Sequence, residues 1–284
     1  MDGIMSQGPI VVANSKVNAD SKSGTVYGIY SKGTLNLANS EINISSEKEN
    51  AFGIDNWMEG KIENTTVNVN SDAKNTIGIS NATGIKITLA NVNVFADAIS
   101  SDGPNNSIGI TNHGEMMFYS GSVYGLHSGL QNSAGAKLYV YGGTFDGYGH
   151  GGIYFAQGPN GEAYVENATL KSGEYKGQHD ESKFSLSHGG SFYIGGGTAA
   201  NNSNNKVYMN GCTITSVKGT MGVLRGSDGE TNNQLYISNS TIENGKKMRI
   251  DENQKLFVGK GTNITEANVS SVDRVEFTNE EYKR

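Results

Sequence analysis

A short motif recurs along the chain at a nearly constant interval: an apolar residue, any residue, and then asparagine or glycine. The intervals between successive motifs are 25, 25, 27, 30, 21, 25, 44 and 28 residues, so nine copies share a period near 25 with one large insertion. Repetition at such a period is typical of solenoids, in which each repeat packs only against its neighbours. The recurring turn residues are Asn14, Asn39, Asn64, Asn91, Gly121, Gly142, Asn167, Gly211 and Asn239.

The segments beside each turn residue alternate apolar and polar side chains, as in TLNLANSEINIS (34–45) and KIENTTVNVN (61–70). Such alternation is typical of half-buried strands. Asparagine and glycine accept the positive φ of a tight corner. A strand, a corner and another strand in every repeat predict an all-β fold, a single-stranded right-handed parallel β-helix of about nine to ten coils.

Equivalent positions of successive coils should stack on one another about 4.8 Å apart. The first predicted interior stack contains Leu37, Ile62, Leu89, Tyr119, Val140, Val165, Met209 and Ile237. The second contains Ile42, Val67, Val94, Tyr124, Phe145, Leu170, Ile214 and Ile242. An amide follows the Gly-apolar step of four consecutive coils, which predicts an asparagine ladder of Asn56, Asn81, Asn112 and Asn132.

The units GIYSKGTLNLANSEINIS (28–45) and GISNATGIKITLANVNV (78–94) resemble the coils of pectin-lyase-like β-helices. In repeat style they are most similar to the passenger domains of bacterial autotransporter adhesins, over about residues 8–265. The resemblance implies an extracellular or cell-surface location and adhesin-like binding. The start of the chain, MDGIMSQGPIVVANS, shows no export signal.

The β-helix is predicted to cover residues 1–265, with long loops around 171–206 and 225–234. Residues 266–284 are charged, break the repeat and are predicted to form a C-terminal cap or tail. The formal net charge of −6, without a basic stripe, argues against a nucleic-acid partner. The sequence contains no run of 18 apolar residues, so it predicts no membrane span. The single cysteine, Cys212, excludes a multi-thiolate metal site, and we expect neither metal nor cofactor.

Histidine and tyrosine are concentrated where the repeat is least regular. All five histidines lie between residues 113 and 188, and nine of the 14 tyrosines lie between 119 and 193. Aromatic rings stack against sugar faces, and histidine bonds to hydroxyls. The candidate ligand-binding residues, for which ordinary packing is the alternative, are Tyr148, His150, Tyr154, Tyr175, His188 and Tyr193. We expect Tyr119, Tyr124 and Phe145 instead to enlarge the interior stacks.

An enzyme would need acid and base groups that converge on one substrate. Pectin-lyase-like enzymes, which the chain resembles, use clustered aspartates with arginine or lysine on one outer face. The best candidates for catalytic residues here are Asp146, His150 and Arg225. Only one acid occurs in the predicted outer-face row, which reads Tyr30, Asp55, Ser80, Thr111, Gln131 and Tyr154.

Three functions therefore remain open. The first is a non-enzymatic, adhesin-like surface β-helix that recognises a glycan or a host-surface receptor through its aromatic and histidine-rich loop region. The second is a polysaccharide lyase or glycoside hydrolase of the pectin-lyase-like type, including the phage tail spikes. The third is a structural spacer without a ligand.

Overall fold

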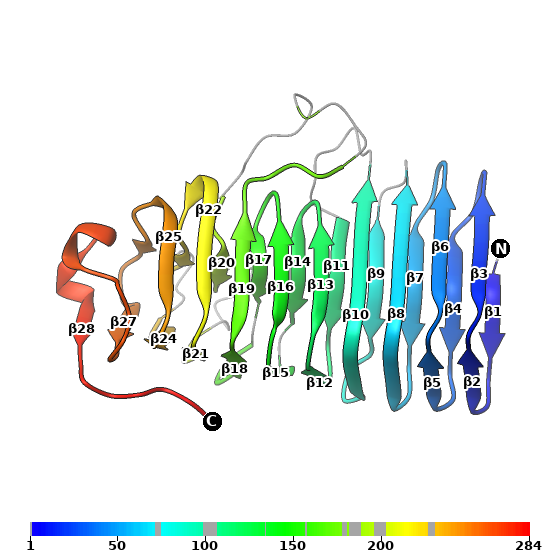
Figure 1. The fold of residues 1–284 in the computed structure, drawn as a ribbon, viewed down its shortest axis with the longest axis horizontal. Coiled ribbons are helices and arrows are strands. Elements are labelled where there is room, and N and C mark those ends of the chain that lie inside the picture. Colours follow the sequence, from blue (N-terminus) through cyan, green and yellow to red (C-terminus); the bar gives the residue numbers. More distant parts are fainter. Residues whose placement is uncertain are drawn as a thin grey trace.

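The computed structural model describes residues 2–71, 75–98, 107–133, 135–156, 158–177, 181, 189–195, 203–226 and 231–284. These residues form a rod of parallel coils, with about nine turns of about 25 residues each (Figure 1). The predicted right-handed parallel β-helix is confirmed.

Each coil contributes strands to three faces. The first face is a ten-stranded sheet, and it lies behind the other two in Figure 1. Its strands, in order, are β1 (Asp2–Ser6), β4 (Val26–Ser31), β7 (Ala51–Asn56), β9 (Thr76–Asn81), β11 (Ser107–Asn112), β14 (Ser128–Asn132), β17 (Gly151–Phe155), β20 (Phe192–Ile194), β23 (Val223–Leu224) and β26 (Arg249–Ile250).

The other two faces lie at the front of Figure 1, the second face below and the third face above it. Two long strands, β8 (Gly60–Ser71) and β10 (Lys86–Ala98), continue through the corner and belong to both faces. The second face also contains β2 (Ile10–Ala13), β5 (Leu35–Ala38), β12 (Glu115–Phe118), β15 (Lys137–Val140), β18 (Glu162–Glu166), β21 (Lys206–Asn210), β24 (Gln234–Ser238), β27 (Lys255–Val258) and β28 (Val275–Phe277). The third face also contains β3 (Lys16–Ser21), β6 (Glu41–Ser46), β13 (Gly121–Gly125), β16 (Gly143–Gly147), β19 (Ala168–Ser172), β22 (Thr213–Thr220) and β25 (Thr241–Lys246).

The corner between the second and third faces explains the recurring asparagines. Six of the predicted turn residues, Asn14, Asn39, Asn64, Asn91, Asn167 and Asn239, have φ between 47° and 53°. Asparagine tolerates this left-handed conformation better than other residues with a Cβ, so it occupies the corner coil after coil. The corner predicted from the repeat is confirmed.

Stacked side chains fill the inside of the rod as one continuous apolar core. The predicted asparagine ladder is also present and fully buried. Asn56 donates to Asn81 at 3.4 Å, Asn81 to Asn112 at 3.0 Å, and Asn112 to Asn132 at 2.7 Å. Each also donates to a main-chain carbonyl, so the ladder ties the coils together and supplies partners for buried backbone groups.

Two predicted members of the interior stacks are wrong. Leu89 pairs with Phe118 rather than Tyr119, and Tyr119 is 45% exposed. The corner of this coil lies at Ser120, whose hydroxyl accepts from the main-chain N–H of Asn91, and not at Gly121. A shift of one residue moves a strand's side chains to the opposite face.

The same shift affects the second stack. Val123, not Tyr124, lies between Val94 and Phe145, and Phe145 is interior as predicted. The Tyr124 side chain is on the outer surface of the third face, where its ring stacks on Phe95 with centroids 5.1 Å apart. It is nevertheless buried, because another segment of the chain covers it.

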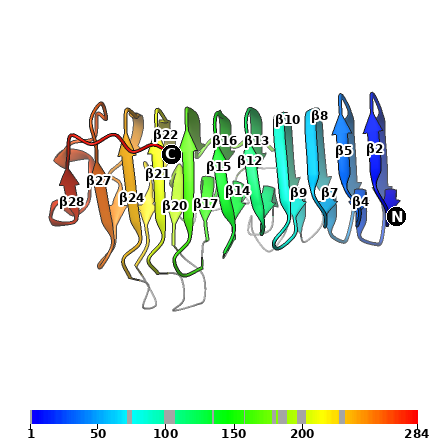
Figure 2. The ribbon, with the colours of Figure 1, turned by 90° about the horizontal axis from the view of Figure 1, so that it is seen from below.

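The C-terminal segment continues the rod before it turns back. After the short 3₁₀ turns η2 (Glu266–Asn268) and η3 (Val272–Arg274), β28 pairs in parallel with β27. The chain then runs back beside the second face (Figure 2). There the Tyr282 ring meets Tyr236 edge-on, and the Arg284 guanidinium lies 4.0 Å from the ring centroid of Tyr139.

Candidate functional site

Four of the rings in the loop-rich middle of the rod meet on the first face. His127 precedes β14, His150 precedes β17, Tyr154 lies in β17 and Tyr193 lies in β20. The centroids of the two imidazole rings are 4.2 Å apart. Among His150, Tyr154 and Tyr193, the ring centroids of each pair are 5.4 Å apart. These four residues, with Arg225, are called the histidine–tyrosine cluster below.

The regular register of the first face places Tyr154 on its outer surface. The predicted outer-face row is confirmed, since its members pair one with the next from coil to coil: Tyr30, Asp55, Ser80, Thr111, Gln131 and Tyr154. Tyr193 continues the same row in the next coil. Tyr154 and Tyr193 are adjacent because they occupy the same position of two successive coils.

Arg225 adds a positive charge to the edge of the cluster. Its Nη1 donates to the hydroxyl of Tyr193 at 3.1 Å. His127 and Tyr193 are buried, whereas His150, Tyr154 and Arg225 are half-buried. The accessible part thus combines an aromatic ring, an imidazole and a guanidinium. These groups suit the apolar faces, hydroxyls and carboxylates of sugars.

Two other candidate residues, Tyr148 and Tyr175, contact each other elsewhere. Their rings meet edge-on at 5.6 Å and pack with Leu126 in a small apolar cluster apart from the main core. The Tyr148 hydroxyl donates to Glu181 at 3.3 Å, and Glu181 also pairs with Lys218. Tyr148 is buried, so its ring has a packing role in this structure.

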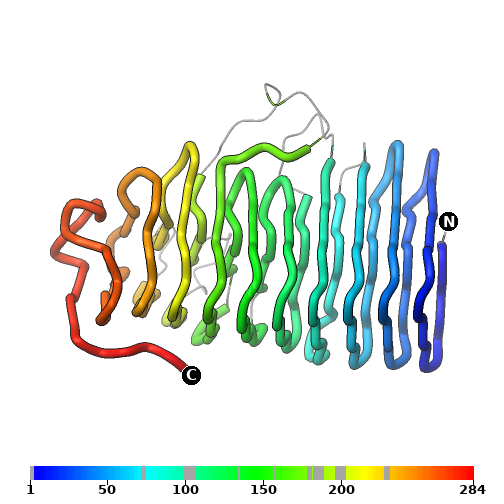
Figure 3. The backbone as a smooth tube through the Cα atoms, in the orientation of Figure 1, coloured from blue at the N-terminus to red at the C-terminus, as the bar shows by residue number. Residues whose placement is uncertain are grey.

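A segment that follows β19 covers part of the third face. Residues 173–177, called the strap below, run from the end of β19 past β16 and β13 toward β10 (Figures 1 and 3). The main-chain N–H of Lys176 donates to the Tyr124 hydroxyl at 3.1 Å. Its Nζ lies 2.5 Å from Oδ2 of Asp146. The strap is therefore fixed to the third face by one neutral contact and one ionic contact.

The structure does not bring the three candidate catalytic residues together. Asp146 lies on the outer surface of β16, in the third face, under Lys176. Arg225 and His150 belong to the cluster on the first face. Burial raises the pKa of the Asp146 carboxyl, and the bond from Lys176 opposes that rise. The acid that sequence placed beside His150 instead pairs with a lysine of the strap.

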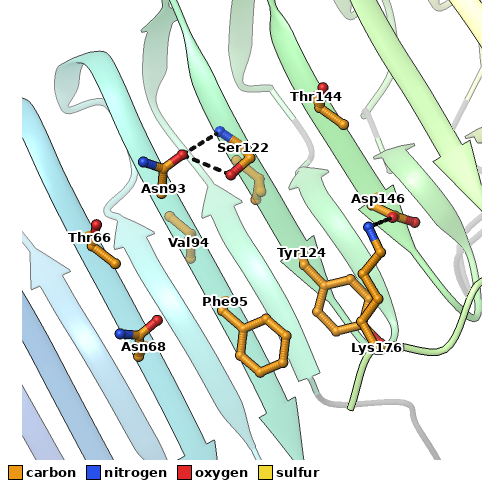
Figure 4. A pocket seen from close by; sticks show the side chains of 11 residues that line it. Thr66, Asn68, Asn93, Val94, Phe95, Ser122, Tyr124, Thr144, Asp146 and Lys176 are labelled. Atoms are coloured by element: carbon orange, nitrogen blue, oxygen red, sulfur yellow. Dashed lines mark hydrogen bonds and ion pairs between the residues drawn. The ribbon is translucent and has the colours of Figure 1, made fainter.

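Beside the strap, the outer surface of the third face has a small hollow of about 210 Å³ (Figure 4). Its rings, Phe95 and Tyr124, were not among the residues predicted to bind a ligand. The sequence carries one sign of it. In the row that passes through Asn18, Asn43 and Asn68, the next coil has Phe95 in place of asparagine. This break in the repeat marks the hollow.

His188, a predicted ligand-binding residue, lies outside the described residues, as do parts of the loops predicted around 171–206 and 225–234. Within the described part of the chain, no three or more histidine, cysteine, aspartate or glutamate side chains form a group that could hold a metal ion. The described residues also contain no helix long and apolar enough to cross a membrane.

We compared the chain with protein-family models, curated proteins and solved structures. No protein-family model, no curated protein and no solved structure matches the chain.

Proposed function

We propose that this protein is a non-enzymatic β-helix of the cell surface or extracellular space that binds a glycan through the histidine–tyrosine cluster. The resemblance of its repeat units to adhesin passenger domains favours this location and role. The observation that carries the proposal is the meeting of four rings from three neighbouring coils, with Arg225 at their edge.

The geometry of the cluster fits a sugar better than a purely apolar partner. The ring of Tyr154 stacks nearly parallel on the imidazole of His150, with an angle of 19° between their planes. Both are half-buried: Tyr154 lies on the outer surface of the first face, and His150 immediately precedes the same strand. A ring face can pack against the C–H groups of a pyranose, while the imidazole and guanidinium bond to its polar groups. Arg225 favours a glycan that carries a carboxylate or sulfate.

A glycan array of neutral and acidic structures tests this proposal, with binding to host cells measured in parallel. We expect the double substitution Tyr154→Ala and His150→Ala to weaken binding about tenfold or more, because one stacking surface and one hydrogen-bonding group are lost. The matched control is Tyr30→Ala, which removes a half-buried tyrosine from the same register row outside the cluster.

Undiminished glycan binding by the double variant would remove the cluster from the proposal. Binding to cells but to no glycan would point to a protein receptor instead. Binding to neither would leave a structural spacer as the function.

The alternative of a polysaccharide lyase or hydrolase is tested on the same glycans by release of reducing ends or unsaturated products. The separation of Asp146 from Arg225 on two faces argues against it. Product formation that is lost in Asp146→Asn would replace the binding proposal with the enzymatic one.

A further inference from the structure

We propose that the hollow beside the strap is a second saccharide site, which takes a single neutral sugar ring. This proposal goes beyond the proposed function, because the hollow lies on the third face and would bind a different class of ligand from the histidine–tyrosine cluster. Its residues occupy two adjacent register rows on β8, β10, β13 and β16 (Figure 4). One row is Asn68, Phe95, Tyr124 and Asp146, and the other is Thr66, Asn93, Ser122 and Thr144.

The first row supplies an aromatic surface. The rings of Phe95 and Tyr124 are nearly parallel, with an angle of 16° between their planes. In Figure 4 the Phe95 ring shows its broad face toward the hollow. Phe95 is half-buried, whereas Tyr124 is covered by the strap. The exposed ring face is therefore that of Phe95, and it matches the apolar C–H face of a pyranose.

The same row ends in a buried acceptor that has no partner. Asp146 is 2% exposed; Oδ2 pairs with Lys176, while Oδ1 is buried without a hydrogen bond. A buried carboxylate oxygen without a donor costs free energy unless a ligand or water supplies one. A sugar hydroxyl is such a donor, and a bond from a neutral O–H to a carboxylate is among the stronger hydrogen bonds.

The second row supplies further polar groups at the opposite side of the hollow. Oδ1 of Asn93 accepts from both the main-chain N–H and the hydroxyl of Ser122, at 3.1 and 2.8 Å. These bonds fix the orientation of the Asn93 amide, whose NH₂ group points away from Ser122 in Figure 4. Asn93, Thr66 and Thr144 line the hollow, and their NH₂ and hydroxyl groups are of the kind that bonds to ring hydroxyls.

The charge and the size of the hollow limit its ligand. Its one cation, Lys176, is already neutralised by Asp146, and Glu174 of the strap also lies within 3.8 Å of the same ammonium. An anionic sugar would meet carboxylate oxygens without a free positive charge, so the hollow favours a neutral one. Its volume of about 210 Å³ is below the roughly 300–1,000 Å³ of pockets for larger ligands, which fits one ring.

Titration of the intact protein with methyl glycosides of glucose, galactose, mannose and N-acetylglucosamine, followed by saturation-transfer NMR, tests this site. We expect at least one of them to bind with a Kd on the order of 1 mM, because a single ring offers few contacts. Methyl glucuronide serves as the anionic counterpart. We expect it to bind at least about tenfold more weakly.

Two substitutions in the hollow should weaken binding of the neutral glycoside without removing the fold. Asp146→Asn keeps the size of the side chain but loses the charged acceptor, and Phe95→Leu keeps an apolar group but loses the flat ring. We expect each to weaken binding about tenfold, with Asn18→Ala, two coils before Asn68 in the same register row, as the control. If Asp146→Asn does not fold, Ser122→Ala takes its place, because it removes one of the two hydrogen bonds that orient the Asn93 amide.

The proposal is overturned if no neutral glycoside binds, if methyl glucuronide binds equally well, or if folded Asp146→Asn and Phe95→Leu bind as the unchanged protein does. Because Tyr154→Ala and His150→Ala leave the hollow intact, their effect on glycan-array binding reports on the cluster alone. The two sites can therefore fail separately.

Discussion

The coils before and after the middle of the rod differ in the side chains that form their longest stacks. In residues 2–98, columns of asparagine join successive coils. At the exposed corner Asn39 donates to Asn14, Asn64 to Asn39 and Asn91 to Asn64, at 3.0–3.3 Å. From residue 137 onward, asparagines still join neighbouring coils in pairs, such as Asn204 with Asn232 and Asn210 with Asn239, but a longer column of stacked aromatic rings crosses the second face. Its members are Tyr139, Tyr164, Tyr208, Tyr236 and Phe257.

The difference follows from the chemistry of like side chains in register. Identical amides 4.8 Å apart can each donate to the next, so an asparagine column fixes both spacing and register. Aromatic rings stacked at 4.5–5.9 Å bury area but tolerate an offset. The directional column accompanies coil intervals of 25, 25 and 27 residues, whereas the ring column accompanies intervals of 25, 44 and 28. The longest asparagine column thus lies among the regular coils, and the longest ring column spans the large insertion.

The stacked rings also present their edges rather than their faces to solvent. Neighbouring planes in the column differ by only 5–14°. At the start of the column the guanidinium of Arg284 covers Tyr139. Sugar recognition needs an open ring face. We therefore assign the column a role in stabilising the rod. The candidate sites contain other rings, which lie on the first and third faces.

The largest effect is expected in the buried asparagine ladder. Asn81→Leu should lower the free energy of unfolding by about 3 kcal/mol, because it removes one buried hydrogen-bond partner from each of the amides of Asn56 and Asn112 and replaces a buried polar side chain by an apolar one beside them. Urea denaturation followed by circular dichroism measures this. The control Asn18→Ala, at the exposed end of another amide row, should change it by less than about 0.5 kcal/mol. Equal losses in both variants would contradict a special role for the buried ladder.

A smaller loss is expected in the ring column. Tyr208→Ala removes two stacked pairs, each with centroids 4.9 Å apart, and should cost about 2 kcal/mol. Tyr208→Phe keeps both pairs and should cost about 0.5 kcal/mol or less. Burial raises the pKa of Tyr208 to about 12, so the phenol is neutral at physiological pH and the stack does not titrate there. The same denaturation measurement decides, and a large loss in Tyr208→Phe would assign the stability to the hydroxyl.

The exposed corner should contribute less again. Asn64 has a φ of 47°, and alanine there should destabilise the protein by about 1 kcal/mol. Asn64→Gly accepts this conformation without strain and should be close to neutral, although both ladder bonds of Asn64 are lost. Thermal unfolding of the two variants separates strain from hydrogen bonding. If glycine is as damaging as alanine, the ladder bonds rather than the backbone conformation matter.

The smallest effect concerns pH and the strap. Burial raises the pKa of Asp146 in the folded protein, so its contribution to stability is complete below the unfolded pKa near 4 and declines as the pH rises through the raised folded value. The charges around it are Lys176, Lys171 and Glu174. Asp146→Asn does not titrate. Urea midpoints between pH 4 and 7 should therefore fall in the unchanged protein relative to this variant, and a relative rise would contradict the stated direction.

Part of the site could be predicted from residue type alone. His150, Tyr154 and Tyr193 were expected to share a ligand-binding region, and their rings do meet. Arg225 was expected near His150 and lies in the same cluster. Asp146 was expected there too, but it lies on β16, a strand of the third face, and the alternation of that strand turns its side chain outward, where Lys176 pairs with it.

The sequence by itself determined the parallel coils, the asparagine corners and the buried amide ladder. Each depends on residues that recur at a fixed interval, and a solenoid converts that interval directly into neighbouring positions in space. Only the tertiary structure decided that Tyr119 and Tyr124 face outward, that the strap crosses β16 and β13, and that a hollow lies beside it. A corner displaced by one residue reverses the faces of the following strand. The path of an insertion depends on contacts, such as Lys176 with Tyr124 and Asp146, that no repeat encodes.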